Sequence, residues 1–188
     1  MQFLALCGSL RAASINAALL RAAGRLAPPG VMLVLHPPLG DLPLFNPDLE
    51  ADPPRPVARL RDAVEAADAL VIASPEYAHG VTGTIKNALD WLVSFEPFVH
   101  KPVAVLNASP RAHHADEALR ETLRTMSARV VEDACVAIPL LGAGLDESAM
   151  VATPAVAGAI ARALEALRAG ATPAPAPPSG APRFSVGP

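Results

Sequence analysis

Gly8-Ser9-Leu10-Arg11-Ala12-Ala13-Ser14-Ile15-Asn16 is the stretch that decides the fold of this 188-residue chain. It follows an apolar run at residues 2–7 and precedes an Ala/Leu-rich segment at residues 17–26, so it predicts the turn from a buried strand into a helix. The first amides of a helix have no partner within the helix and carry a partial positive charge. This turn is therefore a place where an anion can bind.

The side chains around those amides suit a phosphate group. Ser9 and Ser14 offer hydroxyls, Arg11 offers a guanidinium, and Asn16 offers an amide. The stretch is not the fingerprint of a dinucleotide-binding sheet, because Gly8 is its single glycine, and it lacks the Gly-Lys-Ser/Thr end of a triphosphate loop. The alternative is an ordinary turn in which Ser14 is the N-cap of the helix and Asn16 faces solvent.

Composition limits the class of protein. The length fits one domain, and a hydrophobic content of 52% supports a folded core. A formal net charge of −3 gives no electrostatic signature of nucleic-acid binding. No apolar run approaches the roughly 20 residues that cross a bilayer, and Met1-Gln2-Phe3 is not the basic start of a signal peptide. We expect a cytoplasmic protein with no membrane span and no nucleic-acid partner.

The two cysteines, Cys7 and Cys135, each lie in an apolar run that predicts a strand. Small buried core residues in a reducing compartment are the expected interpretation. Because Cys7 adjoins the proposed phosphate loop, a redox role remains an alternative. No spacing of Cys and His in the sequence indicates a metal site.

Apolar runs alternate with helical patterns along the chain. We expect strands at residues 3–7, 31–35, 69–73, 103–107 and 130–138, and helices at residues 14–26, 57–67, 84–93, 116–128 and 154–167. Strands that are apolar throughout belong in a parallel sheet covered on both faces. The pattern predicts an α/β fold with a doubly wound five-stranded parallel sheet, as residues 1–169. A change to Ala, Pro, Ser and Gly predicts a disordered or extended tail at residues 170–188.

A second informative stretch follows the third expected strand. Residues 74–91 read Ser-Pro-Glu-Tyr-Ala-His-Gly-Val-Thr-Gly-Thr-Ile-Lys-Asn-Ala-Leu-Asp-Trp, a turn that runs into a helix. In the strand order 2-1-3-4-5, the first and third strands border the point at which the winding reverses and ligands bind. The two loops therefore face each other. One can hold a phosphate while the other lies along the flat group that carries it.

These stretches together resemble a known family. Gly8-Ser9-Leu10-Arg11 with Ser14 and Asn16, then Pro75-Glu76-Tyr77, then Gly83 with Lys86-Asn87-Ala88-Leu89-Asp90-Trp91 are similar to the paired signatures of the NADPH-dependent FMN reductase family. That flavodoxin-like family includes quinone, azo-dye and chromate reductases. The loop Asp41-Leu42-Pro43-Leu44-Phe45-Asn46 also resembles the family's loop after the second strand. The resemblance covers roughly residues 2–168.

The resemblance implies a set of cofactor contacts. The FMN phosphate would be held by Ser9, Arg11, Ser14 and Asn16 and by the amides around Ile15. The isoalloxazine would lie beside Pro75, Glu76, Tyr77 and Ala78, mostly through backbone groups, and near Ser109. Backbone amides are suited to negative charge that develops on a reduced ring, and Gly80 would let the main chain approach closely. The alternative for Glu76 and Tyr77 is a solvated acid and a packing aromatic.

Three departures from the family pattern stand out. Ala78 takes the place of the usual Asn, Thr82 often corresponds to a Pro, and the glycine-rich turn after the fourth strand is Arg111-Ala112-His113-His114-Ala115. Hydride transfer through FMN needs no protein acid or base, so no catalytic side chain is required. His79, and also His113 and His114, are candidate proton donors to a reduced quinone. The alternative is that they are exposed loop histidines without a role.

The helix expected at residues 84–93 carries two further expectations. Lys86 and Asp90 are spaced for a weak surface ion pair. Leu89, Trp91 and Leu92 are expected in the core or in a subunit contact. Members of the family associate through helices beside this site, so the resemblance implies a homodimer or homotetramer whose neighbour completes the substrate pocket.

The implied function is that of an FMN-dependent NAD(P)H oxidoreductase. NADPH or NADH would be the co-substrate, and a small molecule such as a quinone or azo compound would accept electrons through bound FMN. One alternative is an FMN reductase that supplies reduced flavin to a partner monooxygenase. Another is a non-enzymatic flavodoxin-type electron carrier, although the Ser/Thr-Gly-Thr phosphate loop typical of a long flavodoxin is absent.

Overall fold

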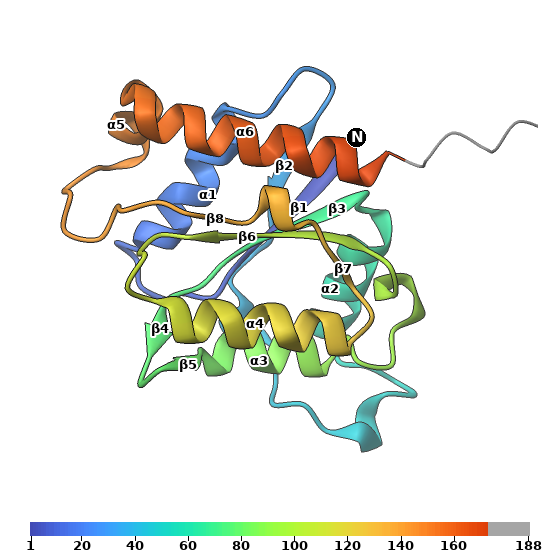
Figure 1. Cartoon of the computed structure of the whole chain (residues 1–188). Helices are drawn as coiled ribbons and strands as arrows, with labels where there is room; N and C mark the ends of the chain where they lie inside the picture. Colours follow the sequence, from blue (N-terminus) through green and yellow to red (C-terminus); the bar gives the residue numbers. More distant parts are fainter. Residues whose placement is uncertain (173–188) are drawn as a thin grey trace, which may run out of the picture.

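A parallel sheet forms the centre of the computed structural model, which describes residues 1–172 (Figure 1). Its strands are β1 (Gln2–Cys7), β2 (Met32–Leu35), β3 (Ala69–Ala73), β6 (Pro102–Asn107), β7 (Arg129–Val130) and β8 (Val136–Ala137). They run in the order β2-β1-β3-β6-β7, and β8 also pairs with β6. All of these pairings are parallel, so the predicted doubly wound sheet and its 2-1-3-4-5 order are confirmed.

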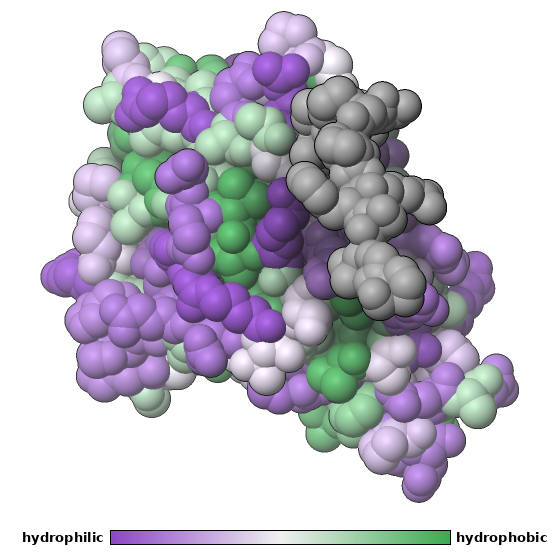
Figure 2. Space-filling model, turned by 45° about the vertical axis from the view of Figure 1, so that its right-hand side comes forward, coloured by the Kyte–Doolittle hydropathy of each residue, from purple (hydrophilic) through white to green (hydrophobic). Residues whose placement is uncertain are grey.

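Helices cover both faces of the sheet (Figure 1). They are α1 (Ile15–Arg25), α2 (Arg55–Ala66), α3 (Gly83–Asp90), α4 (His113–Thr125), α5 (Glu147–Ala152) and α6 (Pro154–Ala171). Two buried apolar clusters separate the layers, one under α1, α5 and α6 and the other under α2, α3 and α4. Helix α5 was not predicted, because its six residues are too few to show a clear helical period. On the outer surface, hydrophilic residues cover most of one side, with apolar residues exposed in a narrow band between them (Figure 2).

The first strand shows why a continuous apolar run is needed. Phe3 and Ala5 belong to the cluster under α1 and α6, whereas Leu4 and Leu6 belong to the cluster on the other face. All four side chains are buried. Because successive residues of a strand point to opposite faces, a strand that is covered on both sides must be apolar at every position.

The last strand is interrupted, and the expectation of one strand over residues 130–138 is wrong. A 3₁₀ turn, η4 (Glu132–Ala134), separates β7 from β8. This turn contains two consecutive acidic residues, Glu132 and Asp133, which are poorly suited to a buried strand. The sequence therefore contains a signal of the interruption. The Val105 amide of β6, which lies opposite the interruption, donates to the Cys135 sulfur at 3.3 Å. Cys135 thus satisfies a backbone group, and burial raises the pKa of its thiol.

The fourth helix begins earlier than the sequence predicts. α4 starts at His113 instead of residue 116, so His113 and His114 lie in its first turn and the expectation of a loop there is wrong. The N-cap residue Ala112 has no side chain that could accept a hydrogen bond. The Ala115 amide donates instead to the Glu76 carboxylate at 2.8 Å. The Glu76 carboxylate, which is distant in sequence, therefore takes the place of a side-chain N-cap. Such a long-range contact cannot be predicted from the local sequence.

The third helix ends earlier than predicted, at Asp90 instead of residue 93. Arg61 of α2 donates two hydrogen bonds to the carbonyl of the next residue, Trp91, at 3.0 and 3.2 Å. That carbonyl therefore has its partners outside the helix. Lys86 and Asp90 form the expected ion pair on the exposed face of α3.

The loop between β2 and α2 is held against α3 by two side chains. Asn87 donates from Nδ2 to the Pro43 carbonyl at 2.9 Å and accepts from the Phe45 amide at 2.8 Å. Trp91 donates from Nε1 to the same carbonyl at 2.9 Å, and the Phe45 ring meets its indole edge-on. Trp91 is fully buried, which confirms its expected place in the core. Asn87 of α3 and Trp91, the residue after its end, therefore anchor this loop together.

The last helix crosses the expected end of the domain. α6 continues through Ala171, whereas the change in composition predicted an end at residue 169. Residues 173–188 of the expected tail lie outside the described residues. Within residues 1–172, no helix has the length and apolar character that a membrane span needs.

We predict that Asn87→Ala lowers the free energy of unfolding by about 1–3 kcal/mol, because the Phe45 amide loses its acceptor and the Pro43 carbonyl loses one of its two donors. Urea denaturation measures the change. Lys86→Ala is the matched control on the same helix, since it removes only an exposed ion pair. Equal stability of the two variants would contradict the anchoring role.

Candidate functional site

A cleft lies beyond the carboxyl ends of the central strands, where the loops after β1, β3 and β6 meet. Its volume is about 320 Å³, which lies within the range of ligand pockets. The lining residues are Ser9, Arg11, Ser14, Ile15, Asn16, Ser74, Pro75, Glu76, Tyr77, Asn107, Ser109, Arg111, Ala112 and Leu141. Nine of the ten residues predicted to bind the cofactor are in this set, and Ala78 is not.

Gly8 brings two walls of the cleft into contact. Its amide donates to the Ala73 carbonyl at 2.9 Å, and a Cβ placed on it would collide with the Ser74 hydroxyl and lie 2.6 Å from Ile85. The Thr82 hydroxyl donates to the Gly8 carbonyl at 3.1 Å and lies 3.1 Å from the Ser74 hydroxyl. Glycine is required here because the backbone of the loop after β1 lies directly against the Ser74 and Ile85 side chains, with no room for a Cβ.

The start of α1 carries unsatisfied donors. Ser14 is the N-cap, as one alternative predicted, and its hydroxyl accepts from the Ala17 amide at 3.2 Å. Its own hydrogen remains available to a ligand. The amides of Ile15 and Asn16 have no acceptor within residues 1–172. Asn16 is 4% exposed and its Oδ1 has no partner among the described residues, so the alternative of a solvated Asn16 is wrong.

A positive charge stands beside these amides. Arg11 is exposed and lines the cleft, and no carboxylate of the described chain lies within 4.0 Å of its guanidinium. Its amide makes a 3.4 Å hydrogen bond to the Ser9 hydroxyl, which holds the loop in a tight turn. Two hydroxyls, two amides and a guanidinium therefore converge on one end of the cleft, an arrangement that binds a phosphate.

The second wall is a short hairpin that the sequence analysis missed. Strands β4 (Glu76–Tyr77) and β5 (Gly80–Val81) pair antiparallel around a two-residue turn. Ala78 and His79 in this turn have φ values of 50° and 58°, the left-handed conformation that favours Asn and Gly. The hairpin was missed because neither favoured residue is present at these two positions.

Gly80 is predicted to let the main chain approach the cofactor ring, and no close contact with the described part of the protein itself requires a glycine at this position. A Cβ at this position would lie 3.5 Å from the Tyr77 carbonyl, an ordinary contact distance. Tyr77 itself is 60% exposed at the edge of the cleft. Its ring is therefore available to a ligand, and it does not pack in the core as the alternative for Tyr77 supposed.

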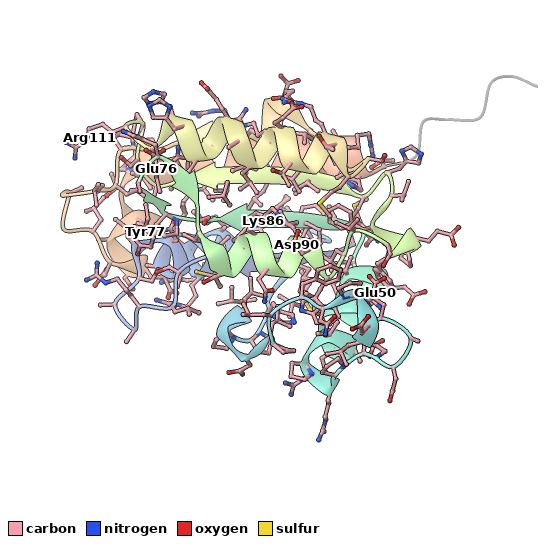
Figure 3. All side chains as sticks on the ribbon, turned by 90° about the horizontal axis from the view of Figure 1, so that it is seen from below. Glu50, Glu76, Tyr77, Lys86, Asp90 and Arg111 are labelled. Carbon is pink, nitrogen blue, oxygen red and sulfur yellow. The ribbon has the colours of Figure 1, made fainter. Side chains whose placement is uncertain are left out.

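Glu76 ties the hairpin to α4. Its side chain is 11% exposed, and its two oxygens accept from the Ala115 amide at 2.8 Å and pair with His79 Nδ1 at 3.0 Å. The alternative of a solvated acid is therefore wrong. The hydrogen bond from Ala115 and the contact with His79 hold the pKa of Glu76 below its ordinary value. Figure 3 shows Glu76, Tyr77 and Arg111 at the same end of the molecule, away from Glu50.

The third wall follows β6. Asn107 is 6% exposed, accepts from the Ser109 amide at 2.9 Å and donates to the Ala112 carbonyl at 3.1 Å. The Ser109 hydroxyl accepts from the Arg111 amide at 3.3 Å. These bonds fix a turn that carries Arg111 into the cleft lining. Asn107 was missed, although a polar residue that ends a buried strand is a recognisable signal.

Three histidines lie beside this turn. The rings of His79 and His114 are 4.3 Å apart between centroids, and those of His113 and His114 are 4.0 Å apart. None of the three lines the cleft, and His79 is 76% exposed. The described residues contain no cluster of His, Cys, Asp and Glu that could hold a metal ion.

An open parallel sheet with a cleft at the switch point of its strand order defines a flavodoxin-like fold. Residues 1–141 match the model of a family described as NADPH-dependent FMN reductase. The chain therefore belongs to the NADPH-dependent FMN reductase family.

Individual relatives agree with this assignment. An NAD(P)H-dependent FMN reductase of Pseudomonas aeruginosa is 42% identical over 112 residues, 58% of this chain and 60% of that protein. A quinone reductase of Pseudomonas putida is 40% identical over 125 residues, 62% of this chain and 66% of that protein. The aligned segments thus span less than two thirds of either relative.

A solved structure matches more of the chain. The flavoenzyme FerB, an NAD(P)H:(acceptor) oxidoreductase of Paracoccus denitrificans, superposes with a TM-score of 0.71 at 28% identity. The match covers 90% of this chain and 98% of that one. The likeness therefore includes the sheet, its helices and the loops that surround the cleft.

We predict that Glu76→Gln lowers stability near neutral pH, because the charge that the Ala115 amide and His79 favour is lost. The folded pKa of Glu76 is below its ordinary value, so its contribution is complete above 4.5 and disappears as the pH falls through the folded pKa. Urea midpoints of the two proteins should converge in acid. A gap that stays constant down to the acid end of the titration would refute this assignment.

Proposed function

We propose that the chain is an FMN-dependent NAD(P)H oxidoreductase that reduces quinones or similar small acceptors. The observation that carries the proposal is the set of unsatisfied donors at the start of α1, where the amides of Ile15 and Asn16 meet the cleft. A dianionic phosphate ester is the ligand that such a set accepts. The membership of the family and the names of the relatives agree with it.

The residues of the cleft fit FMN in two further respects. Asn16 Oδ1 is buried without a partner among residues 1–172, and a hydroxyl of a sugar-like chain next to the phosphate would supply the missing donor. Arg11 has no carboxylate partner in that range and offers the charge that a phosphate needs. Arg11, Ser9 and Ser14 would hold the phosphate, and Asn16 would hold the chain attached to it.

The walls beyond the phosphate would hold the ring. Pro75, Glu76 and Tyr77 line one side of the cleft, and Ser109 lies on the turn opposite. Glu76 keeps the hairpin backbone fixed through its bond to α4, so backbone amides can be presented to the ring without reorganisation. FMN bound there would supply the redox chemistry, which is hydride transfer from a reduced nicotinamide to the acceptor.

No side chain of the cleft is assigned as a general acid or base. Glu76 is the single carboxylate in the lining, and both of its oxygens are engaged with Ala115 and His79. The role of the protein is therefore to orient two planar molecules against each other and to exclude water between them. His79 lies outside the lining and would have to donate a proton from the rim.

We propose further that the chain acts as a homodimer or homotetramer. Large apolar side chains are exposed on the α3 side, with Leu44 at 84%, Val93 at 62% and Tyr77 at 60%. Burial of these side chains against a second copy of the chain would be favourable. A second copy seated there would cover Tyr77 and close the cleft.

Purified protein tests the function directly. We expect a yellow protein that consumes NADPH or NADH in the presence of menadione, with FMN retained through turnover. FMN that leaves after each reduction would favour a flavin-supplying reductase. A flavin-loaded protein that neither NADPH nor NADH bleaches would refute the enzyme and favour an electron carrier.

Arg11→Ala and Ser14→Ala are each predicted to weaken FMN binding by about 1.5–3 kcal/mol or less, because each removes a charge-assisted contact to the phosphate. Fluorescence titration of the apoprotein with FMN measures the loss. Arg25→Ala, at the opposite end of α1, is the control and should bind FMN as the wild type does. Unchanged affinity in both test variants would contradict the phosphate assignment.

A further inference from the structure

We propose that Arg111, flanked by His79, His113 and His114, forms an anion-recognition rim that selects substrates carrying an oxyanion group. The group is a phosphate or sulfonate on one of the two substrates, either the 2′-phosphate of NADPH or an acidic substituent of the acceptor. The inference rests on the proposed function and adds the substrate class to it.

The position of Arg111 is the first support. Its side chain is exposed, yet the residue belongs to the lining of the cleft. Its backbone is fixed by the bond to Ser109 and by the buried Asn107 below it. Within residues 1–172, no carboxylate lies within 4.0 Å of its guanidinium. A guanidinium without a carboxylate partner among these residues is available to bind an anion.

The charge balance at the cleft is the second support. Arg11, Glu76 and Arg111 are the charged residues of the lining. Arg11 lies at the start of α1 with the donors assigned to the cofactor phosphate. Glu76 is occupied by the Ala115 amide and His79, and does not neutralise Arg111. One guanidinium is therefore left for a second anion.

The topology keeps the two arginines apart. Arg11 follows β1 and Arg111 follows β6, and β3 lies between these two strands in the sheet. A phosphate bound at the start of α1 would thus leave Arg111 at the far side of the ring. That side is where a substrate must approach. A group on the substrate, and not the phosphate of the cofactor, is the partner that this position favours.

The histidines extend the same surface. His113 and His114 occupy the first turn of α4, and His114 stacks edge-on against His79 of the hairpin. The row carries hydrogen-bond donors across the gap between the hairpin and α4. A single arginine would attract an anion without fixing its orientation. The additional imidazole groups can form hydrogen bonds with the substrate at further points and so orient it.

The test compares matched substrates in wild type and Arg111→Ala. The pairs are NADPH with NADH, and 1,4-naphthoquinone-2-sulfonate with 1,4-naphthoquinone. Removal of Arg111 should lower kcat/KM about tenfold, through KM, for the member of one pair that carries the additional phosphate or sulfonate, and should change kcat/KM much less for the member that lacks it. Arg111→Lys should recover part of the loss. Arg129→Ala, at the amino end of β7, is the control and should change neither pair.

A binding measurement accompanies the kinetics. NADP⁺ and NAD⁺, and the two quinones, are titrated into the oxidised protein while the imidazole proton resonances of His79, His113 and His114 are followed by NMR. We expect these resonances to shift more with the ligand of one pair that carries the additional phosphate or sulfonate than with its partner. This difference should be lost in Arg111→Ala. The pair that shows the effect identifies the source of the oxyanion.

Three results would overturn the inference while leaving the proposed function intact. They are a wild type with no preference in either pair, an equal loss for the members with and without the additional phosphate or sulfonate, and a loss of FMN retention in Arg111→Ala. In the last case Arg111 would hold the cofactor. Failure of the proposed function is seen separately, as a wild type that binds no FMN.

Discussion

The contact between the loops after β1 and β3 is the constraint on which the site depends. Gly8 has no room for a side chain, and its carbonyl accepts from the Thr82 hydroxyl at 3.1 Å. Thr82 in turn caps α3, since its hydroxyl accepts from the Ile85 amide. The start of α1, the end of β3 and the start of α3 are thereby fixed together, and the cleft is the space that remains beside them.

This arrangement leaves the protein with binding groups that it does not satisfy itself. A buried acceptor without a partner costs about 1–3 kcal/mol, and Asn16 Oδ1 is such an atom within the described residues. The amides of Ile15 and Asn16 and the guanidinium of Arg11 also need a partner from outside the described residues. We infer that a phosphorylated ligand would satisfy these groups. Binding would then remove the free-energy cost and stabilise the folded state.

Much of the architecture could be predicted from the sequence, because parallel strands leave continuous apolar runs and α1 has both a Ser N-cap and an Ala/Leu repeat. The turn from β1 into α1 could be located for the same reason. The start of α4 could not, since its amide is capped by Glu76 from a distant segment. The left-handed turn at Ala78 also depends on strain that local patterns do not encode, whereas the two acidic residues of η4 were a signal of the break between β7 and β8.

The central claim is that the first amides of α1 bind the phosphate of FMN. The most direct measurement is an NMR titration of ¹⁵N-labelled apoprotein with FMN and, in parallel, with riboflavin, which lacks the phosphate. The account predicts that the amide resonances of Ile15 and Asn16 shift in a saturable way with FMN and much less with riboflavin. Equal shifts with both ligands, or no shift at these two amides, would contradict it.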